Sequence, residues 1–383
     1  MTVMWKKNLT VILLLTILYP LACKPFASEE DITIDGVQIS PFRTFESWGR
    51  RQGGAIYKEI LVSVDAMDRG GIPNGYIYDV ASGTKICNLN FSFSINGKDY
   101  YPPHGNQVSF SNKFYDSESD FPLLYISQVN GGNGNNDIRG ERGVLVYNLK
   151  KLTDNSYEPE LVQAIIPNLN DSTLMSKMGN YTPNYIIDTD KGQLVVIGYP
   201  NKSWYDLSGP QPITIFDLPD ITEGQEIVLT SESVVDYYTL PVTIALQQSF
   251  YCDGKIFSSG GNRGYASIRV INLSQKGVEY YYDMTSLTSG EPQFLGLWEG
   301  RVLYYEYDQY GIVYELTIPG YVFSNNGIQV SIKGNPAREM MNKRKVYDLN
   351  GKISFRNDKG IKVVSEFEDI KKIFINLLSP KYQ

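Results

Sequence analysis

The chain has 383 residues, with 35 Lys and Arg against 42 Asp and Glu, a single His and three Cys. A net charge of −7 argues against a nucleic-acid partner, which requires a basic surface. So few His and Cys exclude a His-rich or four-cysteine zinc site and a disulfide scaffold. The chain is 42% hydrophobic, which favours a folded protein over a disordered one. We expect no metal and no other cofactor.

Residues 1–22 have the pattern of a lipoprotein signal peptide. Two lysines precede an apolar run from Leu9 to Ala22. That run is shorter than the roughly 20 residues of a membrane-spanning helix and is typical of a secretory signal. It ends at Cys23 in a Leu-Ala-Cys sequence that resembles a lipobox, although Pro20 stands where Leu is usual. We expect lipid attachment at Cys23; the alternative is an ordinary signal peptide with a chance cysteine.

Residues 23–50 are expected to be an acidic linker. The cluster Ser-Glu-Glu-Asp at 28–31 resembles a surface-export signal of Bacteroides-group lipoproteins, and a solvated linker explains it equally well. We expect an outer-membrane lipoprotein that faces the periplasm or the cell surface. Cys87 and Cys252 lie far apart in the sequence, and free thiols are expected there rather than a disulfide.

From about residue 53 the chain repeats a unit of short apolar strands joined by tight turns. Asp253-Gly254 and Glu299-Gly300 stand between apolar runs, which is typical of hairpins. A third strand with β-branched or aromatic residues in alternation ends each unit. Its closing polar residues are Asp79, Asn148, Asp217, Asn272 and Glu315, spaced by 69, 69, 55 and 43 residues.

This repeat, with almost no helical pattern, predicts an all-β chain forming a β-propeller. The 283 residues from Gln52 to Gly334 give about 47 per blade for six blades, within the usual range of ~40–50. We therefore expect a six-bladed propeller over residues 51–340. A pair of β-sandwiches is the alternative, but it leaves the recurrent third strand unexplained.

Residues 341–383 are predicted to be a short C-terminal extension of strands and a helix. Segments 345–352 and 360–364 have strand patterns, and residues 366–378 have apolar residues at helical spacing. We expect this extension to cap the last blade.

Several segments resemble the TolB-like six-bladed propellers found among lipoproteins of the Bacteroides group, most of them uncharacterised. The resembling segments, in order, are 52–57, 104–110, 120–127, 161–167, 213–219, 248–257 and 291–304. One departure is Gln293, where a second Glu would be expected after Glu291. The resemblance implies a six-bladed propeller and a secreted lipoprotein, and it implies no established activity.

Polar residues just before the predicted inner strands are candidates for a ligand site at the channel mouth, because they converge from different blades. They are Gln52, His104, Asn106, Gln248 and Glu291. The alternative is that they hydrogen-bond neighbouring blades. His104 is the only imidazole and has no evident carboxylate partner, so we assign no catalytic residue.

Tyrosine doublets and triplets fall on the repeat strands, where packing between blades is the expected role. Trp204 and Tyr205 lie in a long loop and are candidates for an aromatic surface that binds a sugar or a protein. We expect a lipid-anchored binding or scaffold module for a glycan or an envelope protein. One alternative is a carbohydrate-active enzyme, a glycosidase or lyase, at the channel mouth; a glycosidase would need two facing carboxylates there. The other alternative is an envelope-assembly factor. No G-x-S-x-G motif is present.

Overall fold

The structure is a computed structural model. It describes residues 36–48, 51–67, 70–128, 142–179, 181–201, 207–261, 266–288, 290–307, 311–325, 327–331 and three short strands between 345 and 363. The predicted signal peptide, Cys23, Trp204, Tyr205 and the helix predicted over 366–378 lie outside the described residues. In the described residues, no helix has the length and apolar character needed to cross a membrane.

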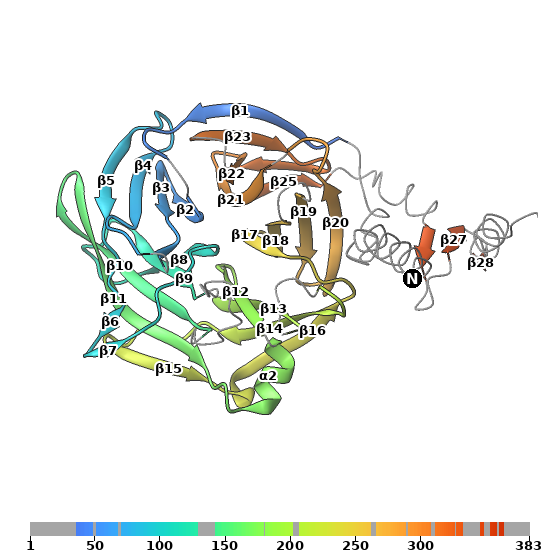
Figure 1. The fold of residues 1–383 in the computed structure, drawn as a ribbon, viewed down its shortest axis with the longest axis horizontal. Helices are drawn as coiled ribbons and strands as arrows, with labels where there is room; N and C mark the ends of the chain where they lie inside the picture. Colours follow the sequence, from blue (N-terminus) through green and yellow to red (C-terminus); the bar gives the residue numbers. More distant parts are fainter. Residues whose placement is uncertain are drawn as a thin grey trace, which may run out of the picture.

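Five antiparallel sheets stand around a central axis in the described part of the chain, so the fold is a β-propeller (Figure 1). Blade 1 consists of β2 (Gly53–Tyr57), β3 (Ile60–Val64), β4 (Gly75–Asp79) and β5 (Lys85–Leu89). Blade 2 consists of β8 (Val108–Phe114), β9 (Pro122–Ser127), β10 (Val144–Thr153) and β11 (Ser156–Pro167). Blade 3 consists of β12 (Tyr181–Asp188), β13 (Gln193–Tyr199), β14 (Gln211–Asp217) and β16 (Val234–Leu240).

The remaining two blades complete the ring. Blade 4 consists of β17 (Leu246–Cys252), β18 (Lys255–Gly260), β19 (Ser267–Asn272) and β20 (Gly277–Asp283). Blade 5 consists of β21 (Glu291–Trp298), β22 (Arg301–Tyr307), β23 (Ile312–Thr317) and β1 (Gln38–Thr44). The prediction of an all-β propeller is confirmed, and the prediction of six blades is wrong.

The error in the blade count has a physical cause. Each recurrent third strand of the sequence is the third strand of one blade: β4, β10, β14, β19 and β23. Dividing the propeller length by about 47 residues per blade gave six, because that length includes insertions that are not blade strands. These insertions are β6 (Ser94–Ile95), β7 (Lys98–Asp99), α2 (Ser172–Met178), β15 (Gln225–Leu229) and η3 (Ser231–Ser233).

The insertion β15 also links two blades. It lies in sequence between β14 and β16 of blade 3, but it pairs in parallel with β11 at the outer edge of blade 2. Gln163 is opposite Gln225 in this pairing. Figure 1 shows β15 and β16 following one another along the outside of the ring.

The ring is closed by the N-terminal strand β1, which pairs antiparallel with β23 in a register that places Gln38 opposite Thr317. Residues 38–44 are therefore part of the propeller, whereas the sequence placed them in a linker. Closure of this kind joins the two ends of the ring by backbone hydrogen bonds and removes a free sheet edge. Trp48 follows this strand and packs between Tyr78 of blade 1 and Tyr305 of blade 5, with ring centroids 5.1 and 5.3 Å away.

Apolar clusters fill the spaces between neighbouring blades, so both faces of most inner and middle strands are buried. Many of the repeat-strand tyrosines belong to these clusters. Those with less than 2% exposure are Tyr78, Tyr125, Tyr147, Tyr185, Tyr199, Tyr282, Tyr304 and Tyr305. Packing between blades is therefore the main role of these side chains, as predicted.

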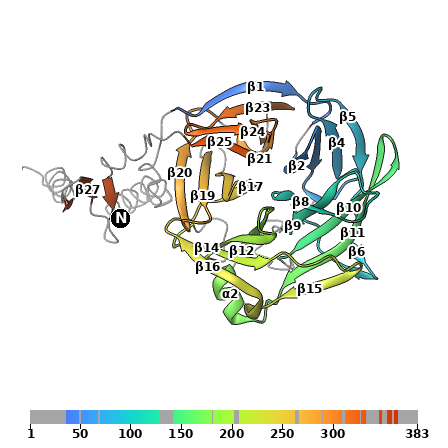
Figure 2. The same ribbon diagram turned by 180° about the vertical axis from the view of Figure 1, so that it is seen from behind.

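A short hairpin follows blade 5 in the chain, formed by β24 (Tyr321–Ser324) and β25 (Gly327–Ser331). It packs on blade 4, since the Tyr321 ring lies 5.1 Å from that of Phe257 and the Ile328 N–H donates to the Asp253 carboxylate. Figure 2 shows the hairpin from the other side of the ring.

The last described strands form a separate antiparallel sheet of β26 (Lys345–Tyr347), β27 (Ile353–Asn357) and β28 (Gly360–Val363). Strands occur in both predicted segments, with a further strand between them. Packing of the extension on the last blade stays a prediction. Cys87 and Cys252 are free thiols, as expected.

Candidate functional site in the central channel

The first strand of each blade faces the central axis, so β2, β8, β12, β17 and β21 line the channel (Figure 1). All five begin at the same end of the ring, which we call the mouth. The pocket that lies farther along these strands is called the cavity. The two regions differ in chemistry, and we describe them separately.

Of the residues predicted for the mouth, Gln52, Asn106 and Gln248 are buried, and His104 and Glu291 are half-buried. Asn106 and Glu291 are connected through Gln247. The Gln247 side chain donates from Nε2 to Glu291 Oε1 at 2.6 Å, and its Oε1 accepts from Asn106 Nδ2. An ionised carboxylate can only accept, so Glu291 fixes the orientation of both amides. Asn106 Oδ1 is consequently left buried without a partner.

Gln247 was missed by the sequence reasoning, which selected its neighbour Gln248. The available signal was the Gln-Gln pair itself, since adjacent residues of a strand point to opposite sides and each finds a different partner. Asn184 of β12 also contacts this position, because its Nδ2 donates to the Gln247 carbonyl at 3.3 Å.

Deeper in the channel, Gln107 and Gln248 tie blade 2 to blade 4. Gln248 Nε2 donates to the Val108 carbonyl at 2.8 Å, and Gln248 Oε1 accepts from the Val108 N–H at 3.2 Å. In return, Gln107 Oε1 accepts from the Ser249 N–H at 2.8 Å, and Gln107 Nε2 donates to the Ser249 carbonyl at 3.0 Å. We call these two side chains the glutamine pair.

The glutamine pair satisfies backbone groups on the free edges of β8 and β17, which would otherwise be buried without partners. Gln107 is 0% exposed and Gln248 is 1% exposed. Gln248 also lines the cavity, so the pair stands at its boundary. Gln248 is a link between blades, which was the alternative role considered for it from the sequence.

Gly53 lies against this pair. A Cβ atom at Gly53 would stand 2.3 Å from the Gly105 carbonyl oxygen and 2.8 Å from Gln248 Oε1. Only glycine allows β2 to approach the channel this closely.

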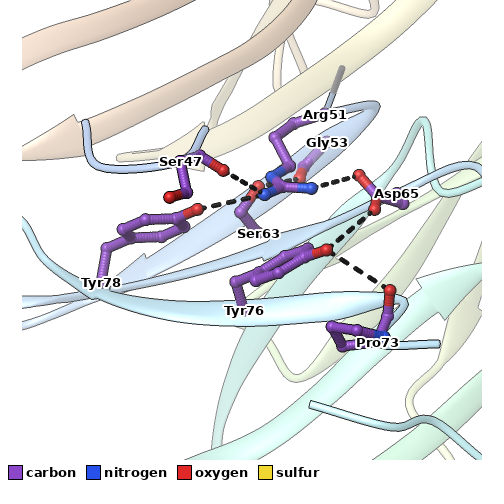
Figure 3. Close-up of polar contacts among 8 residues, drawn as sticks. All are labelled: Ser47, Arg51, Gly53, Ser63, Asp65, Pro73, Tyr76 and Tyr78. Carbon is purple, nitrogen blue, oxygen red and sulfur yellow. Dashed lines mark hydrogen bonds and ion pairs between the residues drawn. The ribbon is translucent and has the colours of Figure 1, made fainter. Parts of the chain in front are cut away.

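Beside the mouth, Arg51 anchors the segment that precedes β2 (Figure 3). Its guanidinium donates to Asp65 Oδ1 at 2.7 Å, to the Ser47 carbonyl at 2.7 Å and to the Tyr78 hydroxyl at 3.2 Å. It also lies 3.5 Å from the centre of the Tyr76 ring. Burial raises the pKa of Asp65, which the Arg51 charge opposes. Arg51 and Asp65 are the charged pair among these contacts, and they hold the segment before β2 in place. We therefore assign this pair a structural role.

The cavity has a volume of about 230 Å³ and is lined by all five inner strands. The lining residues are Gly54, Ala55, Ile56, Val108, Ser109, Phe110, Ile187, Thr189, Gln248, Ser249, Phe250, Tyr251, Leu295, Gly296 and Leu297. No Asp, Glu, His, Lys or Arg is among these described lining residues. The cavity is therefore an uncharged space in which apolar and aromatic side chains stand beside hydroxyl, amide and backbone polar groups.

Two aromatic walls of the cavity are held rigidly. Phe250 stacks on Phe257 with ring centroids 4.9 Å apart and an interplanar angle of 7°. Tyr251 donates from its hydroxyl to Asp190 Oδ2 at 2.7 Å and accepts from the Gly254 N–H at 2.9 Å. Burial raises the pKa of Tyr251, and the Asp190 carboxylate raises it further. The tyrosine wall therefore stays neutral.

The polar groups in the lining are hydroxyls and amides. The Ser249 hydroxyl is already bonded to Ser258 Oγ at 2.9 Å, and Gln248 belongs to the glutamine pair. Ser109 and Thr189 are half-buried and bring hydroxyls to the lining. In the described chain, no three His, Cys, Asp or Glu residues are grouped so as to hold a metal ion.

The sequence matches no protein-family model and no curated protein. Among solved structures, the chain is similar to an exo-β-1,3-galactanase from Phanerochaete chrysosporium, with 10% identity and a TM-score of 0.43 over 77% of this chain and 67% of that one. It is similar to an aldose sugar dehydrogenase from Streptomyces coelicolor, with 10% identity and a TM-score of 0.41 over 74% of this chain and 99% of that one. It is also similar to the Cps50 (Swd1) β-propeller domain of Myceliophteria thermophila, with 9% identity and a TM-score of 0.32 over 73% and 100%.

Proposed function

We propose that this protein is a binding module whose cavity takes an uncharged ligand, with the terminal sugar of a neutral glycan as the favoured class. The observation that carries the proposal is the lining of the cavity, in which aromatic and aliphatic walls surround hydroxyl groups and no charged side chain. Sugars combine apolar ring faces with hydroxyls, and aromatic side chains stack on those faces.

We further propose that the propeller is a lipid-anchored protein of the outer membrane, held by acylation at Cys23 and related to the TolB-like lipoproteins. The support is the sequence pattern before Cys23 and the order of the resembling segments. A catalytic role for the cavity is not favoured, because glycoside hydrolysis usually needs two carboxylates and the described lining has none.

The test of the binding function is a panel of neutral and anionic oligosaccharides, titrated with the full-length protein in detergent. We expect saturable binding of neutral members only, because an anion entering the cavity would lose hydration without gaining a counter-charge.

The variant Ser109→Phe should abolish this binding, since the added ring fills the cavity. Ser117→Phe, the same change in an exposed turn, is the matched control and should bind normally. Retention of glycan binding by Ser109→Phe would refute the cavity as the site. Tighter binding of the anionic glycans would refute the proposed ligand class.

The anchor is tested separately by fractionation of cells that produce the wild-type protein or Cys23→Ala. We expect the wild-type protein in the membrane fraction with incorporated fatty acid, and the variant without it. Acylation of the variant would exclude Cys23 as the attachment site.

A further inference from the structure

The side chain of Gln107 has an orientation that is fixed by the backbone. Its Oε1 accepts from the Ser249 N–H at 2.8 Å, across the channel and 142 positions away in the sequence. A peptide N–H can only donate, so the oxygen of the amide must face Ser249 N, and the nitrogen is left to donate to the Ser249 carbonyl and to Ser109 Oγ. Full burial of Gln107 leaves no water to compete for either position.

This orientation determines what the Ser109 hydroxyl can do. Gln107 Nε2 donates to Ser109 Oγ at 2.9 Å, so the serine oxygen is an acceptor in that bond. Its own proton remains to be donated, and in the described residues no acceptor takes it. Ser109 is the second residue of β8, two positions after Gln107, and it lines the cavity.

We propose that Ser109 presents a directed hydrogen-bond donor to the cavity, and that the ligand meets it with an uncharged oxygen acceptor such as a ring, ether or carbonyl oxygen. Gln107 is the positioning residue that sets this specificity. The inference deepens the proposed function and rests on it.

The uncharged character of the acceptor follows from the lining. A carboxylate or phosphate would accept from Ser109 equally well, but no cationic side chain stands among the described lining residues to balance its charge. Burying an unbalanced anion costs more than one hydroxyl bond returns.

The test uses two probes of matching shape, cyclohexanone and methylenecyclohexane, in which a C=O is replaced by C=CH₂. Calorimetric titration of the full-length protein should show that the ketone binds about tenfold more tightly, a difference of ~1.4 kcal/mol. Ser109→Ala should remove that ratio while both probes still bind. Thr189→Val, which removes a different cavity hydroxyl, is the matched control and should keep the ratio.

Gln107→Glu tests the positioning role through the same ratio. A carboxylate at this position still accepts from the Ser249 N–H, and its second oxygen takes the Ser109 proton. The ketone preference should therefore be lost although Ser109 is present, which a purely structural role for Gln107 does not predict. Should this variant fail to fold, Ser109→Ala still decides the donor.

Each outcome is decisive. Equal binding of the two probes to the wild-type protein, or loss of the ratio in Thr189→Val but not in Ser109→Ala, overturns the inference and leaves the cavity as a binding site. Failure of both probes to bind also overturns it, and the oligosaccharide panel then shows independently whether the proposed function falls as well.

Discussion

The glutamine pair makes a strong prediction about stability: replacing Gln248 by Ala should destabilise the propeller. The wild-type side chain donates to the Val108 carbonyl at 2.8 Å and accepts from the Val108 N–H at 3.2 Å. Val108 is 1% exposed, and in the variant its N–H loses its partner, whereas its carbonyl keeps only the 3.4 Å bond from Gln107 Nε2.

The size of the effect follows from the orphaned N–H group. A buried backbone group left without a hydrogen bond costs ~1–3 kcal/mol, so the free energy of unfolding should fall by about 1–3 kcal/mol. The lower end applies if water enters from the adjacent cavity. At about 2 °C per kcal/mol for a domain of this size, Tm should fall by about 2–6 °C.

The assay is thermal and urea unfolding followed by circular dichroism. Gln225→Ala, the same change at an exposed position of β15, should leave Tm unchanged. Gln248→Met keeps the side-chain volume but not the hydrogen bonds, and should be at least as unstable as Gln248→Ala. Recovery of wild-type stability by Met would show that packing, and not hydrogen bonding, explains the loss. An unchanged Tm for Gln248→Ala would refute the link between blades 2 and 4.

Three further predictions concern stability. Gly53→Ala should lower Tm, because the added Cβ would stand 2.3 Å from the Gly105 carbonyl oxygen. Gly277→Ala is the control and should leave Tm unchanged, because no atom lies closer than 3.7 Å to its Cβ position. Equal Tm values for the two variants would contradict this explanation. Arg51→Met should cost ~3 kcal/mol in denaturant unfolding, because it leaves the partly buried Asp65 unpaired; a cost near zero would argue against the anchor. Burial raises the pKa of Glu226, but hydrogen bonds from Lys98 and Tyr100 outweigh it and lower the pKa below the usual 4.5. The Tm advantage of wild type over Glu226→Gln should then be present near neutral pH and disappear as the pH falls below 4.5; a pH-independent difference would exclude this cause.

Much of the fold could be predicted from local patterns. Hairpin turns, apolar alternation and the five third strands identified a β-propeller, because turn chemistry and strand alternation depend on neighbouring residues alone. The number of closing residues, five from Asp79 to Glu315, already equalled the number of blades. The count failed because the residue total includes β15, α2 and other insertions, and no local pattern separates these from a blade.

Only part of the candidate site could be predicted from the sequence. Of the polar residues selected from the sequence, Asn106, Gln248 and Glu291 take part in hydrogen bonds between inner strands, although Gln248 and Glu291 lie within strands and not before them. Their role in ligand binding stays a prediction. The cavity was not foreseen, because Ser109, Thr189 and Phe250 look like ordinary strand and turn residues in the sequence. Gln107 gave no signal beyond its position, and its partner Ser249 is 142 residues away.

The sequence by itself determined that this chain forms a β-propeller, and it marked the tyrosines that pack between blades. The tertiary structure decided that five blades close the ring, that β1 completes the last of them, and that the glutamine pair joins blades 2 and 4. The physical reason is the range of the interactions. Strands and turns follow from residues a few positions apart, whereas closure and the cavity depend on edges of distant strands that meet only when the ring is complete.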